Sequence, residues 1–102
     1  MNNFGLLPKQ YQIISRILEK YLLSSQSVVV YGSRAKGNYK ETSDIDLVIK
    51  GDYKQDIIGN LLDEIDESNF PYLCDISYFE KITSQNLKEH INRVGKVFYE
   101  KS

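Results

Sequence analysis

Two aspartates stand two residues apart in the run Ser43-Asp44-Ile45-Asp46-Leu47-Val48-Ile49. Its alternation of polar and apolar residues predicts a strand over 44–50, and a strand directs the side chains of Asp44 and Asp46 to one face. Two carboxylates at this spacing repel each other, and a bound divalent cation removes that repulsion. Since hard oxygen ligands suit Mg²⁺ or Mn²⁺, the pair predicts a metal site.

A turn with polar groups precedes these aspartates. Residues 27–31 contain three successive valines, which predicts a strand buried on both faces, and Gly32, Ser33 and Arg34 follow it. Gly32 permits a tight turn with close backbone approach, and Ser33 offers a hydroxyl at the start of a predicted short helix, an arrangement suited to phosphate. Arg34 or Lys36 can add a cation there, the alternative for each being a solvated surface position. Metal beside phosphate indicates chemistry on a nucleotide.

The spacing of these residues resembles a known signature. Gly32-Ser33, ten further residues and then Asp44-x-Asp46 resemble the motif of the DNA polymerase β-like nucleotidyltransferase superfamily. The fuller run Gly32-Ser33-Arg34-Ala35-Lys36-Gly37 resembles its small prokaryotic branch, the minimal nucleotidyltransferases. The resemblance implies an α/β fold, with a small mixed β-sheet and helices packed mainly on one side. It also implies metal-dependent transfer of a nucleoside monophosphate, AMP from ATP, to a hydroxyl.

A third carboxylate, Asp75, lies within residues 72–79, which we predict to be a strand. The superfamily has its third acidic residue on such a strand, and Asp75 matches that position. The resemblance therefore implies that Asp44, Asp46 and Asp75 are catalytic and hold Mg²⁺ or Mn²⁺. It also implies that Asp75 can take the proton of the attacking hydroxyl, and that Gly32, Ser33 and Arg34 bind the nucleotide. The alternative for Asp75 is a strand-end residue facing water.

The composition is that of an ordinary globular chain, 102 residues long with a net charge of −1. We predict a single domain over residues 1–102. The absence of a basic excess gives no indication of long nucleic acid as a partner. The single cysteine, Cys74, excludes an internal disulfide and suits a reducing cytoplasm. The sequence has no apolar span long enough to predict a membrane segment.

The partner is implied by the resemblance alone. Minimal nucleotidyltransferases work beside a separate helical protein of the HEPN class, and in several pairs this protein is an RNase toxin that receives AMP on a tyrosine. The resemblance thus implies an antitoxin with a HEPN-domain partner, as a homo- or hetero-oligomer. Two alternatives stay open. One is a non-catalytic antitoxin that neutralises its partner by contact, and the other is a small-molecule nucleotidyltransferase whose site a partner subunit completes.

The rest of the chain is predicted to form the scaffold that positions these residues. Apolar residues at helical spacing predict helices over 8–23 and 54–68. A last helix is predicted to begin after a cap at Thr83 or Ser84 and to stop at Gly95 in the C′ position.

Two further segments are predicted to be structural and to have no role in the site. The acidic run of the second helix is predicted to be a solvated face, not a metal cluster; its members are Asp63, Glu64, Asp66 and Glu67. Residues 97–99 are predicted to be a short extended tail.

Overall fold

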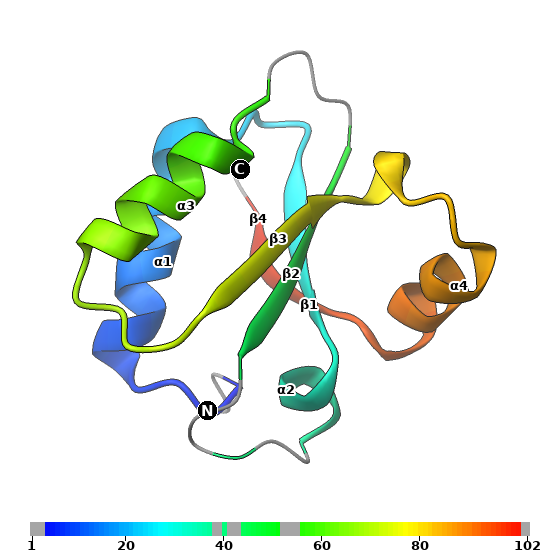
Figure 1. Cartoon of the computed structure of the whole chain (residues 1–102), viewed down its shortest axis with the longest axis horizontal. Coiled ribbons are helices and arrows are strands. Elements are labelled where there is room, and N and C mark those ends of the chain that lie inside the picture. The colour runs from blue at the N-terminus through cyan, green and yellow to red at the C-terminus, as the bar shows by residue number, and fades with distance from the viewer. Residues whose placement is uncertain (1–3, 38–39, 41–43, 52–55, 101–102) are drawn as a thin grey trace.

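The computed structural model describes residues 4–37, 40, 44–51 and 56–100. Figure 1 shows a β-sheet with helices on both of its faces, which confirms the predicted α/β class. In chain order the elements are α1 (Pro8–Tyr21), β1 (Ser27–Tyr31), α2 (Ser33–Lys36), β2 (Ile45–Lys50), α3 (Ile58–Glu67), β3 (Cys74–Tyr78), the 3₁₀ turn η1 (Phe79–Lys81), α4 (Gln85–Val94) and β4 (Lys96–Glu100). None of the helices among the described residues has the length and apolar character needed to cross a membrane.

The sheet is mixed, as predicted, with the strands in the order β3-β2-β1-β4. β1 runs antiparallel to both β2 and β4, whereas β2 and β3 run parallel. A parallel pair needs a crossover connection because a tight turn joins only antiparallel strands, and α3 lies within that connection. This topology brings the starts of β2 and β3 to the end of the sheet where β1 finishes and α2 follows (Figure 1).

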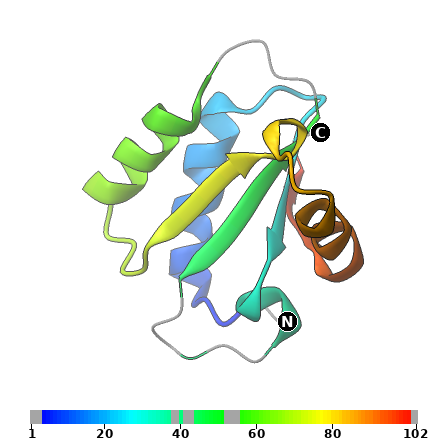
Figure 2. The same cartoon turned by 45° about the vertical axis from the view of Figure 1, so that its right-hand side comes forward.

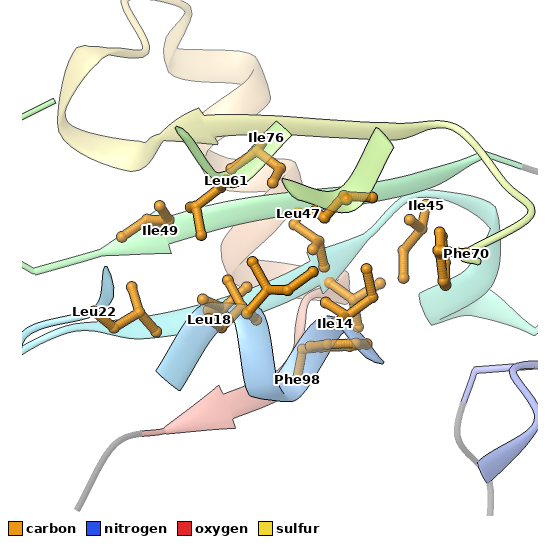
Figure 3. Packing of buried hydrophobic residues seen from close by; sticks show 14 of the residues in the cluster. Ile14, Leu18, Leu22, Ile45, Leu47, Ile49, Leu61, Phe70, Ile76 and Phe98 are labelled. Atoms are coloured by element: carbon orange, nitrogen blue, oxygen red, sulfur yellow. The ribbon is translucent and has the colours of Figure 1, made fainter. Parts of the chain in front are cut away.

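The larger core lies between the sheet and the helices α1 and α3 (Figures 1 and 2). Ile14 and Leu18 of α1 and Leu61 of α3 have no exposed surface, and they pack with Leu47 of β2. Figure 3 shows these side chains meeting in one layer. Burial of a large aliphatic side chain contributes about 1.5–3 kcal/mol, so each residue of this layer stabilises the fold substantially.

The opposite face of the sheet carries α4. Val29 of β1, Val48 of β2 and Ile91 of α4 form a second, smaller buried cluster there. The predicted burial of the valine run on both faces is confirmed, because Val28 and Val30 belong to the larger core. Helices α1 and α3 therefore fit the prediction of packing on one side, and α4 is the exception to it.

The helix α1 begins at Pro8 as predicted but ends earlier than residue 23. The backbone of Leu22 is extended, with φ −72° and ψ 143°, yet its side chain is only 2% exposed. The apolar spacing continues past the last helical turn because Leu22 reaches the core from outside the helix. Periodicity alone therefore overestimated the length of the helix.

The helix α3 begins at Ile58, later than the predicted residue 54, and residues 52–55 lie outside the described residues. Its start is held by β3. The Tyr78 hydroxyl accepts a hydrogen bond from the Ile57 N–H at 2.7 Å and donates one to Asp56 Oδ1 at 3.0 Å.

The acidic run of α3 is a solvent-facing surface, as predicted. Asp63, Asp66 and Glu67 are exposed, and Glu64 is half-buried against α1. Glu64 accepts hydrogen bonds from Lys20 Nζ at 2.7 Å and from the Tyr21 hydroxyl at 2.5 Å. One acid of the run thus joins two helices, and the others face water.

Ser84 caps the helix α4, since its hydroxyl accepts a hydrogen bond from the Leu87 N–H at 3.2 Å. Gly95 ends the helix in an extended conformation, φ −66°, and not in the left-handed one expected at C′. Glycine is needed there for space, because a Cβ atom would lie 2.4 Å from the Ile91 carbonyl oxygen and 2.6 Å from Val29 Cγ1. The predicted tail that follows is the strand β4, paired with β1.

Candidate active site

Asp46 of β2 and Asp75 of β3 are direct neighbours in the parallel register of the two strands. Adjacent strands lie about 4.8 Å apart, and paired residues direct their side chains to the same face. Asp46 lies two residues before Val48, so both carboxylates are on the face of the sheet that carries α4. Asp44 is exposed and lies just before β2 begins. All three predicted acids therefore gather at one end of the sheet.

The three carboxylates affect one another electrostatically. Burial raises the pKa of Asp46 above its ordinary value, and the negative charges of Asp75 and then Asp44 raise it further. Repulsion between like charges is therefore built into the end of the sheet where β2 and β3 begin.

This repulsion predicts a pH dependence of stability without metal. Because the pKa of Asp46 is raised in the folded chain, the folded state binds a proton there more tightly than the unfolded chain does. The stability that Asp46 contributes is present below its unfolded pKa of about 3.9 and is lost as pH rises through its folded pKa. We expect Asp46→Asn to melt at a higher temperature than the wild type at neutral pH in a chelator.

Thermal unfolding of both proteins between about pH 3 and pH 7 measures this difference, which should shrink toward the acid end. Asp66→Asn is the matched control, since it makes the same chemical change on the exposed face of α3. If Asp46→Asn and Asp66→Asn follow the same curve, the electrostatic account of this site is wrong.

Gly32 joins β1 to α2 with φ 77° and ψ −155°, a conformation open in practice only to glycine. A Cβ atom built on Gly32 would lie 2.5 Å from Asp46 Oδ2. The backbone of the turn therefore packs against the carboxylate itself. Ser33, half-buried, is the first residue of α2 and follows directly. The structure thus brings the predicted nucleotide-binding turn and the predicted metal ligand into contact.

Arg34 is held differently from its two neighbours in the turn. Its side chain is 1% exposed, and Nη1 donates a hydrogen bond to the Phe4 carbonyl oxygen at 2.8 Å. The guanidinium carbon lies 4.7 Å from the centroid of the Tyr72 ring. Contacts of Arg34 or of the exposed Lys36 with a nucleotide phosphate stay predictions.

Two residues that sequence reasoning did not select, Tyr31 and Ser77, also belong to this end of the sheet. Tyr31 pairs with Asp46 across β1 and β2, and Ser77 of β3 is among the side chains that influence its pKa. The pKa of Tyr31 is raised, first by burial and then by the charges of Asp46 and Asp75. Its phenol therefore stays protonated beside the carboxylates. The sequence signal that could have identified Tyr31 is its position directly before Gly32.

The donor set fits a divalent cation in its chemistry. Asp44, Asp46 and Asp75 offer only carboxylate oxygens, which suit Mg²⁺ or Mn²⁺, and a cation would relieve their repulsion. Among the residues that the structure describes, however, no group of three or more His, Cys, Asp or Glu side chains is already arranged to hold a metal ion. The three acids thus remain predicted ligands, which binding would have to draw together.

Comparison with known proteins identifies relatives of this arrangement. The family model "Polymerase beta, Nucleotidyltransferase" matches residues 12–102. The chain is 32% identical over 95 residues to the "Probable protein adenylyltransferase MntA" of Haemophilus influenzae, covering 91% of this chain and 82% of that protein.

Solved structures share the fold. One similar chain comes from a toxin–antitoxin crystal structure with AMP-PNP, at TM-score 0.70 and 20% identity, over 88% of this chain and 73% of that one. Another comes from a variant of the toxin–antitoxin complex MntA-HpeT, at TM-score 0.67 and 20% identity, over 93% of this chain and 74% of that one.

Proposed function

The chain belongs to the polymerase beta nucleotidyltransferase family, and we propose that it transfers AMP from ATP to a tyrosine hydroxyl of a HEPN-domain toxin, acting as its antitoxin. The observation that carries the proposal is the contact between Gly32 and Asp46, with Asp75 beside Asp46 on the next strand. A phosphate-binding turn against paired carboxylates is the arrangement that nucleotidyl transfer needs.

The proposed roles follow from the chemistry of each group. Asp44, Asp46 and Asp75 hold Mg²⁺ or Mn²⁺, which when bound neutralises charge that develops on the phosphates. Gly32 permits the tight turn that lets the backbone approach the triphosphate of ATP closely, and the Ser33 hydroxyl donates a hydrogen bond to it. Asp75 is exposed at the edge strand β3, so it is accessible to an incoming hydroxyl and can accept its proton.

The exposure of two carboxylates and the net charge of the chain support a protein as the acceptor. Asp44 and Asp75 are exposed, so a macromolecule can reach them. The net charge of −1 gives no steering toward RNA or DNA. The name of the Haemophilus influenzae relative, and the toxin–antitoxin complexes among the similar structures, support the same choice.

The mass of the partner tests this proposal. A cognate HEPN-domain protein incubated with this chain, ATP and Mg²⁺ is expected to gain about 329 Da for each AMP that it receives on a hydroxyl. The gain should require the divalent metal and should disappear when the acceptor tyrosine is changed to phenylalanine.

Other outcomes of this experiment identify the alternatives. Neutralisation of the toxin without a mass gain, equally strong with Asp46→Asn, would indicate an antitoxin that acts by contact. Transfer of label from α-labelled ATP to a small hydroxylated compound, with the protein unmodified, would indicate a small-molecule nucleotidyltransferase.

A further inference from the structure

We infer that Arg34 is a positioning residue, which holds the Gly32–Ser33 turn in place from the protein interior, and that it is not a ligand of the triphosphate. The inference rests on the proposed function, because it concerns the turn that is proposed to bind ATP. It is carried by the burial of Arg34 and by the segments that its guanidinium joins.

The helix α2 cannot hold its own position. It has four residues, Ser33–Lys36, which is about one turn, and a helix this short is not stable without tertiary contacts. Two of its side chains supply such contacts, since Arg34 is 1% and Ala35 3% exposed. Arg34 is the larger of these two, and it is among the largest fully buried side chains of the described chain.

A buried guanidinium is costly unless hydrogen bonds and nearby electron density compensate its charge. Arg34 has such compensation from two segments that are distant in sequence. The Phe4 carbonyl accepts the hydrogen bond from Nη1 at 2.8 Å, and the Tyr72 ring lies 4.7 Å from the guanidinium carbon. The second contact has the geometry of a cation–π interaction. Arg34 therefore joins the start of the chain, the turn and the segment before β3.

Both contacts of Arg34 are themselves supported by packing. The Phe4 ring stacks on Phe98 of β4 with centroids 5.9 Å apart. The Tyr72 ring contacts Phe70 edge-on at 5.7 Å, and Phe70 is 8% exposed. The guanidinium is therefore fixed to the main body of the fold and not to a loose surface.

The position of the turn matters because Gly32 lies against Asp46. A small displacement of α2 would move the Gly32 backbone and the Ser33 hydroxyl relative to the carboxylates. Arg34 thus acts on nucleotide binding through the turn, while its charge is already engaged by Phe4 and Tyr72.

A set of variants separates an anchor from a phosphate ligand. Arg34→Lys keeps the charge but loses the planar guanidinium, and Tyr72→Leu leaves Arg34 intact but removes the ring beneath it. If Arg34 is an anchor, both should weaken ATP binding in Mg²⁺, by about tenfold or more for Arg34→Lys, which loses a buried hydrogen bond from a charged group. Lys36→Met is the control for the exchange measurement that follows, since it removes a cation from an exposed position of the same helix and no buried contact.

Amide hydrogen exchange of residues 32–36 without nucleotide provides the second measurement, at a temperature below the melting point of each variant. Faster exchange in both Arg34→Lys and Tyr72→Leu, but not in Lys36→Met, supports the anchor. Unchanged exchange in Arg34→Lys and Tyr72→Leu, together with ATP binding that is kept in both and lost in Arg34→Met, which removes the charge, overturns it and makes Arg34 a phosphate ligand. Since this readout needs no ATP, faster exchange in a chain that never binds ATP would leave the anchor standing and refute the proposed function.

Discussion

Replacing Asp46 by asparagine is expected to lower nucleotidyl transfer by about a thousandfold or more, in a protein that is more stable than the wild type when metal is absent. Loss of a metal-holding carboxylate removes several kcal/mol of charge stabilisation in the transition state, and each 1.4 kcal/mol is a factor of ten in rate. The same substitution removes the charge whose burial, and whose repulsion from Asp75 and Asp44, raise the pKa of Asp46. Opposite effects on activity and stability are typical of residues placed for chemistry.

The rate of AMP transfer to the partner tests the expected loss of activity, and the melting temperature in a chelator tests the expected gain of stability. Asp66→Asn, on the exposed face of α3, should keep its activity. Ser33→Ala should lie between the two, about ten- to a hundredfold slower, because it loses the one hydrogen bond proposed to a charged phosphate, worth roughly 1.5–3 kcal/mol. Wild-type activity in Asp46→Asn would remove Asp46 from the catalytic site.

The position of Asp46 beside the turn could be predicted because the relevant signals are local. The run of valines identified the first strand and alternation the second, and the two strands pair so that Gly32 lies near Asp46. The pairing of Asp46 with Asp75 is not local. The helix α3 and its connections separate the two strands, and a shift of one residue would turn Asp75 to the other face of the sheet. The family resemblance supplied that match, and the register is consistent with it.

Arg34 illustrates what the sequence could not reveal. A charged residue next to a polar turn is usually exposed, so surface or ligand roles were the natural predictions. Its burial depends on Phe4 and Tyr72, which are 30 residues or more away along the chain. The pairing of β4 with β1 and the location of α4 on the site face are long-range features of the same kind. No periodicity within an element encodes them.

Replacing Gly32 by alanine is expected to have the other large effect, reducing transfer by at least a hundredfold. The φ of 77° and ψ of −155° lie where a side chain costs about 1–3 kcal/mol. The new Cβ would also lie 2.5 Å from Asp46 Oδ2, so the carboxylate or the turn must move. A displacement of about 1 Å in a catalytic group can cost roughly a hundredfold in rate.

Gly37→Ala separates the steric effect from simple backbone strain. Gly37 also has a positive φ, 88°, but a Cβ there would meet no atom of the described residues within 4 Å. Both variants should lose stability, Gly37→Ala by about 1–2 kcal/mol for its left-handed backbone and Gly32→Ala by about 1–3 kcal/mol, whereas only Gly32→Ala should lose transfer at a temperature where both are folded. The rate of transfer and the free energy of unfolding of each variant test this. Equal loss of activity in the two variants would mean that strain in the loop, and not the contact with Asp46, controls the site. Because the new methyl meets Asp46, Gly32→Ala should have a much smaller effect on transfer in a chain that already carries Asp46→Asn than it has in the wild type.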